Sequence, residues 1–305
     1  MTETQRIIKQ GILPESFFVE EIRNDFLVTE RRKKLWAILL DLLLKLDSVC
    51  KKHSLKYSLA FGSILGAVRH HGFIPWDDDV DVCMPRDDYE KLLKLTNEFE
   101  NPYFLQTPYS DKYSAYTWAK LRNSNTTMAS KHFIYNNMNH GILIDIFPYD
   151  KWEVTDHESF DVIKYLALEN STFMRLTNPR LDEKSKKRVQ NWAGIDSLVV
   201  YNTIQRIAQK YHNIDTDYII CAVCSIYDYN KMLMFDEDYK ETVYMDFEGY
   251  SFPIPKGYDR VLKSVYGNYM EFPSIEKRGQ WHNDLIIDTD IPYKEYINRF
   301  IQSKS

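Results

Sequence analysis

A run of acidic residues between Asp77 and Asp81 contains the side chains best suited to chemistry in this chain. Four aspartates occupy positions 77, 78, 79 and 81, directly before a short apolar segment. If residues 80–84 form a strand, Asp79 and Asp81 point to one face and the valines to the other. Two such carboxylates repel each other unless a cation lies between them, and oxygen ligands suit Mg²⁺ or Mn²⁺. Because proteins use these ions mainly to hold phosphates, the spacing predicts a metal-dependent phosphoryl-transfer site.

The alternative interpretation of these aspartates is a solvated turn, because acidic residues favour turns. The preceding residues argue against it, since an apolar segment over 55–61 is followed by Gly62, Ser63 and a helix-compatible stretch over 63–68. A strand, Gly-Ser, a helix and a strand with Asp-x-Asp is the order typical of a nucleotidyltransferase core, in which amide groups at the helix start face a phosphate. We therefore expect Gly62 and Ser63 to face the donor phosphate, with Ser63 lending its hydroxyl.

The segment resembles the LicD family. Residues 62–82, GSILGAVRHHGFIPWDDDVDV, are similar to the family signature, and a Met-Pro-Arg-x-x-Tyr element follows at 84–89. Later blocks match in order, GILIDIFP at 141–148 and a C-terminal block within 252–282. The resemblance implies transfer of a phospho-alcohol group from a nucleotide-activated donor to a hydroxyl of a glycan.

The resemblance also implies the ligands. Phosphocholine from CDP-choline is the expected cargo, Mg²⁺ or Mn²⁺ the expected cofactor, and CMP the expected leaving group. The expected acceptor is a cell-surface glycan, lipopolysaccharide or capsular polysaccharide, or a lipid-linked oligosaccharide. Similar fukutin-related proteins transfer ribitol phosphate and other relatives handle aminoalkyl phosphonates, so the cargo stays open. Two further alternatives are a nucleotidyltransferase acting on a small molecule and a glycan-binding protein without activity.

A third carboxylate is expected to join Asp79 and Asp81. Asp145 lies in the segment GILIDIFP, where strand alternation separates it from the flanking isoleucines. A charged group in an apolar strand needs a partner, and the bound cation would supply one. Alternatively, Asp145 is the base for the acceptor hydroxyl, or it is bonded to backbone amides at a strand edge. Asp77 lies two residues before Asp79, so strand alternation puts it on the same face, and it is a further expected ligand. Asp78 is expected to point away or to cap the turn.

Basic residues near these motifs are candidates for binding the nucleotide. Arg69 is expected on the pyrophosphate, since a guanidinium matches phosphate oxygens in pairs. His70 beside it is either a ligand-binding or a core residue. Lys120 and Arg122 share one strand face, and they either neutralise the leaving nucleotide or form a solvated edge. By the family resemblance, the C-terminal block adds three basic residues: Lys277, Arg278 and His282.

Aromatic residues would be needed for a choline head group, because a quaternary ammonium is bound by aromatic faces. Four of them lie close in sequence to the site motifs: Trp76, Trp118, Trp152 and Tyr149. Trp76, which adjoins the aspartates, is included in the predicted site.

We expect an α+β fold, a nucleotidyltransferase-like mixed sheet flanked by helices. The expected parts are an N-terminal arm over 1–30, a catalytic core over 31–150, a mainly helical insertion over 151–240 and a C-terminal segment over 241–305 that completes the active-site cleft. Helices are expected over 35–53, 63–68, 86–99 and 258–266, and strands over 56–61, 80–84, 103–106, 116–121, 126–129 and 142–147, with a hairpin over 243–254.

Composition narrows the class further. The formal charge of −5 gives no nucleic-acid footprint. The first residues lack the apolar stretch of a signal peptide, and 35–46 is too short to span a membrane. That stretch is expected to be a core-packed helix, with an interfacial helix on lipid as the alternative because 31–34 are basic. The four cysteines form no disulfide framework, and Cys221 and Cys224 are expected to be a buried helical pair. We expect a cytoplasmic protein with at most peripheral association with the inner face of the membrane.

Overall fold

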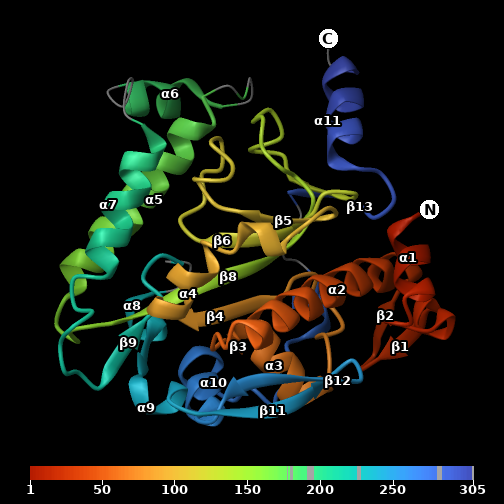
Figure 1. The fold of residues 1–305 in the computed structure, drawn as a ribbon, viewed down its shortest axis with the longest axis horizontal. Coiled ribbons are helices and arrows are strands. Elements are labelled where there is room, and N and C mark those ends of the chain that lie inside the picture. Colours follow the sequence, from red (N-terminus) through yellow and green to blue (C-terminus); the bar gives the residue numbers. More distant parts are fainter. Residues whose placement is uncertain (177, 179–180, 191–195, 225–227, 280–283, 304–305) are drawn as a thin grey trace.

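The computed structural model describes residues 1–176, 178, 181–190, 196–224, 228–279 and 284–303. Its centre is a mixed sheet in which β8 (Ile142–Lys151) runs parallel to β4 (Asp81–Pro85) and antiparallel to β6 (Ala119–Asn123) (Figure 1). The other strands of this sheet are β3 (Ser58–Leu59), β5 (Tyr103–Gln106), β9 (Tyr218–Ile220) and β10 (Leu233–Phe235). The order is β10–β9–β8–β4–β3, with β6 pairing with β8 and β5 with β6. The expected α+β class is confirmed.

Helix α2 (Glu30–Lys52) covers one face of the sheet. It begins after Thr29, whose hydroxyl accepts a hydrogen bond from the Arg32 amide, and its apolar run is almost wholly buried. Val82 and Ile144 share its hydrophobic core, so by strand alternation Asp81 and Asp145 lie on the opposite face. The interfacial alternative therefore fails for this helix, because its apolar side chains face the sheet. No helix in the described ranges is long and apolar enough to cross a membrane.

The first 30 residues pack against α2. They form α1 (Glu3–Lys9), the short 3₁₀ helix η1 (Glu15–Phe18) and a hairpin of β1 (Glu21–Arg23) and β2 (Phe26–Val28). Ile7 is fully buried in the main core, and Arg6 forms an ion pair of 2.5 Å with Asp41 of α2. Buried apolar and ionic contacts together fix this segment to the core.

Two helices follow the strands that carry the signature. α3 (Phe61–His70) comes after β3, and α4 (Arg86–Leu92) comes after β4. α4 ends earlier than expected, because the Thr and Asn that follow favour turns, and only the 3₁₀ helix η2 (Thr96–Glu98) continues it. Arg86 donates to both carboxylate oxygens of Asp150 at 2.7 and 2.6 Å, which joins α4 to β8.

The segment after β8 is mainly helical. Its helices are α5 (His157–Met174), α6 (Glu183–Val189), α7 (Ser197–Ala208), α8 (Tyr229–Met232) and α9 (Asp236–Tyr239). Sequence reasoning missed β9 and β10, three-residue strands too short to show a period. Cys221 and Cys224 are buried as expected, but they lie in a turn after β9 and not in a helix. Pairing with the end of β8 makes residues 218–220 a strand, and the two cysteines come directly after it.

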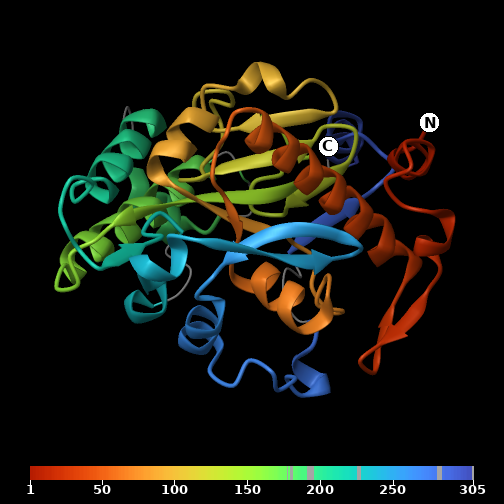
Figure 2. The ribbon, with the colours of Figure 1, turned by 60° about the horizontal axis from the view of Figure 1, so that its bottom comes forward.

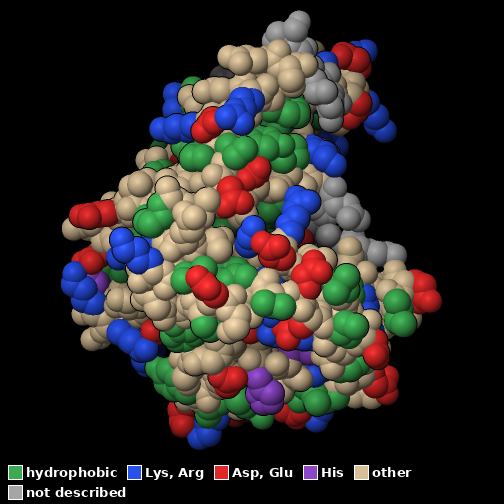
Figure 3. All heavy atoms as spheres, turned by 90° about the vertical axis from the view of Figure 1, so that its right-hand side faces the viewer, with side chains coloured by type: hydrophobic (Ala, Val, Ile, Leu, Met, Phe, Trp, Pro, Cys, Tyr) green, Lys and Arg blue, Asp and Glu red, His purple; other side chains and the backbone are tan. Residues whose placement is uncertain are grey.

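The C-terminal segment contains β11 (Thr242–Phe247), β12 (Tyr250–Pro255), α10 (Tyr258–Tyr266), the 3₁₀ helix η4 (Ile275–Lys277), β13 (Leu285–Asp288) and α11 (Tyr293–Gln302). The hairpin and α10 match the expected ranges, and β11 lies against α3 (Figure 2). β7 (Thr127–Ser130) does not continue the main sheet as expected, because β13 is its hydrogen-bonding partner. Figure 3 shows the side that carries α1, where charges of both signs intermingle.

Candidate active site

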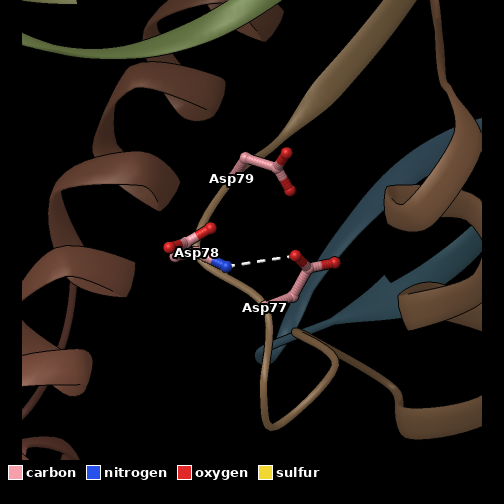
Figure 4. A group of neighbouring side chains, drawn as sticks. All are labelled: Asp77, Asp78 and Asp79. Carbon is pink, nitrogen blue, oxygen red and sulfur yellow. Dashed lines mark hydrogen bonds between the residues drawn. The ribbon is translucent and has the colours of Figure 1, made fainter. Parts of the chain in front are cut away.

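The acidic loop before β4 brings three carboxylates together. Asp77, Asp78 and Asp79 each offer an oxygen within 4.8 Å of the other two. Figure 4 shows Asp77 and Asp79 on one side of the loop and Asp78 on the other, toward α2, with the Asp78 amide donating to Asp77 at 3.2 Å. Hard oxygen donors at this spacing form a set that fits a small divalent cation.

Two side chains of α2 hold the acidic loop in place. Arg32 Nη1 and Trp36 Nε1 donate to the carbonyl oxygen of Asp77 at 2.7 and 3.0 Å. The Arg32 guanidinium also faces the charges of Asp78 and Asp77, while burial lowers its pKa. Sequence reasoning did not assign Arg32 or Trp36 to the site, although the basic run at 31–34 was the available signal.

The first turn of α3 packs directly against Asp77. A Cβ atom on Gly62 would lie 3.1 Å from Asp77 Oδ2, so only glycine lets this carboxylate approach without displacement. Burial, together with repulsion from Asp79 and Asp78, raises the pKa of Asp77 well above its ordinary value. A cation would remove this repulsion, which is further support for a metal among these oxygens.

Ser63 lies beside Gly62 but turns toward β4. Its hydroxyl accepts a hydrogen bond of 2.9 Å from the Asp81 amide, and its own amide donates to the Ala60 carbonyl at 2.9 Å. Ser63 is buried, so it ties the start of α3 to the start of β4. The expected hydrogen bond from its hydroxyl to a phosphate therefore remains a prediction, and the residue has a visible positioning role.

Asp81 and Asp145 are register partners on the parallel strands β4 and β8. Across β8 the row continues through Lys120 of β6, and then through Gln106 of β5. Adjacent strands stand about 4.8 Å apart, so the two aspartates and the lysine are neighbours on one face. The five aspartates thus form two groups, the loop trio and the strand pair.

The Asp145 carboxylate has two side-chain partners on or next to β6. Its Oδ1 accepts hydrogen bonds from Lys120 Nζ and Trp118 Nε1. In the ion pair, the Lys120 side chain is 5% exposed and that of Asp145 is 17% exposed. The role of Asp145 as a metal ligand therefore remains a prediction, and Lys120 compensates its charge in this structure. The alternative in which backbone amides bind the Asp145 carboxylate is not seen among the described residues, where its donors are side chains.

Lys120 and Arg122 share a face as expected, but they are not a solvated edge. β6 lies between β5 and β8, and Arg122 is 1% exposed. Its guanidinium donates to the Gln106 side chain and, at 2.7 Å, to the Gly141 carbonyl, while burial lowers its pKa. Arg122 supports the sheet beneath the site, whereas Lys120 points at Asp145.

An aromatic wall stands beside Asp145. Trp118 lies 5.1 Å from the Phe147 ring and 5.8 Å from Tyr116, and Phe61 lies 5.7 Å from Phe147. Phe61 opens α3 with a φ of 45°, a strained value for a bulky residue and one that often marks a functional site. Trp152 and Tyr149 belong to the same hydrophobic cluster as Phe147, but their ring neighbours are Tyr211 and Tyr239.

A second group of predicted residues gathers at the other end of α3. Arg69 donates to the carbonyls of Tyr269 and Glu271, at 2.5 and 3.1 Å, and the Arg278 guanidinium stacks on Trp76 at 4.6 Å. The structure therefore does not bring Arg69 to the acidic loop as a phosphate ligand would require, because the C-terminal segment occupies it. Burial lowers the pKa of Arg69 to about 10.

His70 is a neutral member of this second group. Its Nε2 accepts from Arg69 Nε at 2.9 Å, and its Nδ1 lies 2.9 Å from the Asn24 side-chain oxygen. Burial and the charge of Arg69 lower the pKa of His70 to about 4. Of the other C-terminal residues predicted for the site, Lys277 is exposed and His282 lies outside the described residues.

Comparison with known proteins agrees with the motifs. The LicD/FKTN/FKRP nucleotidyltransferase domain matches residues 54–167, the range that holds all five aspartates and Lys120. The lipopolysaccharide cholinephosphotransferase LicD of Haemophilus influenzae is 27% identical over 253 residues, which are 80% of this chain and 93% of that protein. An uncharacterized protein of Rickettsia prowazekii is 34% identical over 118 residues, 37% of this chain and 41% of that protein. The resemblance inferred from the motifs is confirmed.

Proposed function

Since residues 54–167 are a LicD-family nucleotidyltransferase domain and the chain is a transferase, we propose that it moves phosphocholine from CDP-choline to a hydroxyl of a cell-surface glycan. The observation that carries this proposal is the row of Asp81, Asp145 and Lys120 beside the acidic loop. Similarity to a lipopolysaccharide cholinephosphotransferase over most of both chains supports the cargo and the acceptor class.

We assign a Mg²⁺ or Mn²⁺ site to the space between the acidic loop and the strand pair. Asp79 and Asp81 are its first ligands, with Asp77 and Asp145 as further oxygen donors. When bound, the ion neutralises charge on the donor phosphates. The crowded carboxylates of the loop support this assignment, because they repel one another without a cation.

The chain's own groups prepare the transfer. The acceptor oxygen forms a bond to the phosphorus of phosphocholine, while the bond from that phosphorus to the bridging oxygen of CMP breaks. As the alternative to its role as a metal ligand, Asp145 is the candidate base for the hydroxyl proton, and Lys120 carries positive charge beside it. Positioning and electrostatic stabilisation account for most of the acceleration in such reactions.

The aromatic wall supports a choline head group. Trp118, Tyr116 and Phe61 are half-buried, so each leaves part of its surface accessible next to Asp145. Lys120 Nζ, which is paired with Asp145, already lies 4.0 Å from the centre of the Tyr116 ring and 5.0 Å from that of Trp118, and aromatic faces attract a quaternary ammonium in the same way. A polyol such as ribitol carries no cation and gains no cation–π attraction from this wall, which favours choline over ribitol.

The test is product analysis with a donor panel. We expect CMP release and labelled glycan with CDP-choline, lipopolysaccharide and Mg²⁺, and at least tenfold slower turnover with CDP-ribitol or a CMP-phosphonate. Asp81→Asn should lower the rate by about 10³-fold or more while its unfolding transition stays that of the parent. Pyrophosphate release from CTP and phosphocholine would instead identify a nucleotidyltransferase.

A further inference from the structure

A polar hollow lies on the same side of the sheet as the proposed active site. It has a volume of about 530 Å³, within the usual range of about 300–1,000 Å³ for small-molecule sites. We call it the Asn-rich hollow and define it by Phe104, Asp111, Asn125, Asn137, Asn139 and Tyr293. It lies among β5, the turn after β6, the loop before β8 and the start of α11.

The floor of the hollow is a built hydrogen-bonding network. Asp111 is 8% exposed, and its Oδ2 accepts from the Gln106 side chain at 2.8 Å and from the Asn139 amide at 2.7 Å. Asn139 in turn donates to the Ser124 hydroxyl at 2.9 Å. Asp111 and Asn139 are therefore held in fixed orientations before any ligand arrives.

The lining groups match a polyhydroxylated ligand. Asn137 presents an exposed amide, which both donates and accepts as sugar hydroxyls require, and Asn125 offers its side-chain oxygen, since its Nδ2 donates to Glu3 at 3.1 Å. Tyr293 and Phe104 add aromatic surface, on which the apolar face of a sugar ring packs. The lining also includes the exposed Lys294, whose charge the buried carboxylate of Asp111 offsets, so the hollow suits a neutral saccharide better than a phosphate.

The strand register links the hollow to the active site. Gln106 is the partner of Lys120, and Phe104 is the partner of Arg122, one pleat further along the same face. From Asp145 to Phe104 the path is about 7 Å along the strands and about 10 Å across two strand spacings. An oligosaccharide spans such a separation, whereas a single sugar at the reaction centre does not.

We propose that the Asn-rich hollow binds saccharide units of the acceptor glycan next to the one that is modified. This inference rests on the proposed function, because it assumes a glycan acceptor. The hollow selects the acceptor by its neutral hydroxyls, while the aspartates and Lys120 act on the donor.

The test separates saccharide binding from catalysis. Saturation-transfer NMR with delipidated core oligosaccharide should show saturable binding to the parent protein. Tyr293→Ala should weaken this binding about tenfold and raise the KM for the acceptor similarly, with kcat and donor cleavage unchanged. The matched control is Tyr296→Ala, a half-buried tyrosine one turn along α11 that does not line the hollow. Both variants are first compared with the parent by thermal unfolding.

The outcomes distinguish the two proposals. Oligosaccharide binding that Tyr293→Ala weakens, without CDP-choline cleavage, would support the hollow and overturn the proposed function. CDP-choline cleavage with equal acceptor KM in the parent and in Tyr293→Ala would keep the function and overturn the hollow. The saccharide proposal would also be overturned if the NMR experiment showed saturation transfer to CMP but none to the oligosaccharide, with Tyr293→Ala weakening the CMP signal. If Tyr293→Ala unfolds, Asn137→Ala replaces it, because Asn137 is exposed.

Discussion

Lys120 forms an ion pair with Asp145, its register partner across the antiparallel strands β6 and β8. The carboxylate is thereby held on the face of the sheet that also carries Asp81, its partner across β4. A lysine at this position gives the site a resident positive charge next to the place where phosphate is expected.

Lys120→Met should cost about 3 kcal/mol of unfolding free energy, because it leaves the Asp145 charge half-buried without its partner. The double variant Lys120→Met/Asp145→Asn should recover most of that loss, since neither charge remains. Neither variant should regain transfer activity. Chemical denaturation and CMP release measure the two effects, and a double variant with parental activity would remove the pair from the mechanism.

Gly62→Ala tests the contact between α3 and the acidic loop. The new Cβ would stand 3.1 Å from Asp77 Oδ2, so the carboxylate has to shift. We expect about tenfold lower activity and weaker Mg²⁺ dependence, because small displacements in such sites are costly. Stability should not fall, since alanine favours a helix more than glycine does.

The control for Gly62→Ala is Val68→Ile, which adds one carbon to the same helix away from the loop. It should keep parental Mg²⁺ dependence. Equal activity of the parent and Gly62→Ala would show that the close approach of Asp77 is not required.

The sequence predicted much of this arrangement. The alternation in GILIDIFP and DVDVCM placed Asp145 and Asp81 away from the core, and the structure pairs them directly. The sequence also predicts the hairpin of β11 and β12, because Glu248-Gly249 separates two strand-like runs. These features depend on local periodicity, which a sequence displays.

Long-range pairing could not be read in the same way. Arg69 binds the carbonyls of Tyr269 and Glu271, two hundred residues further on, and nothing near Arg69 reveals that contact. Arg32 likewise reaches the Asp77 carbonyl from a basic run that equally suits a lipid surface. Cationic side chains bind any acceptor that the fold brings to them, so their partners follow from tertiary structure.

His140 predicts a pH dependence of stability. Burial lowers its pKa to about 4, below the value of about 6.5 for the unfolded chain. The unfolded state therefore takes up a proton first, and stability should fall by about 3 kcal/mol as the pH drops from about 6.5 to about 4. His140→Gln should flatten this part of the profile, whereas the exposed His132→Gln should leave it unchanged. Denaturant unfolding at several pH values measures this, and identical slopes in both variants would contradict it.

One divalent ion is proposed to join the acidic loop to the strand pair. The most direct measurement is anomalous diffraction from crystals of the protein grown with Mn²⁺. We expect a peak about 2.0–2.3 Å from carboxylate oxygens of both Asp79 and Asp81. A map at saturating Mn²⁺ with no peak there, or with one bound by the loop alone and out of reach of Asp81, would contradict it.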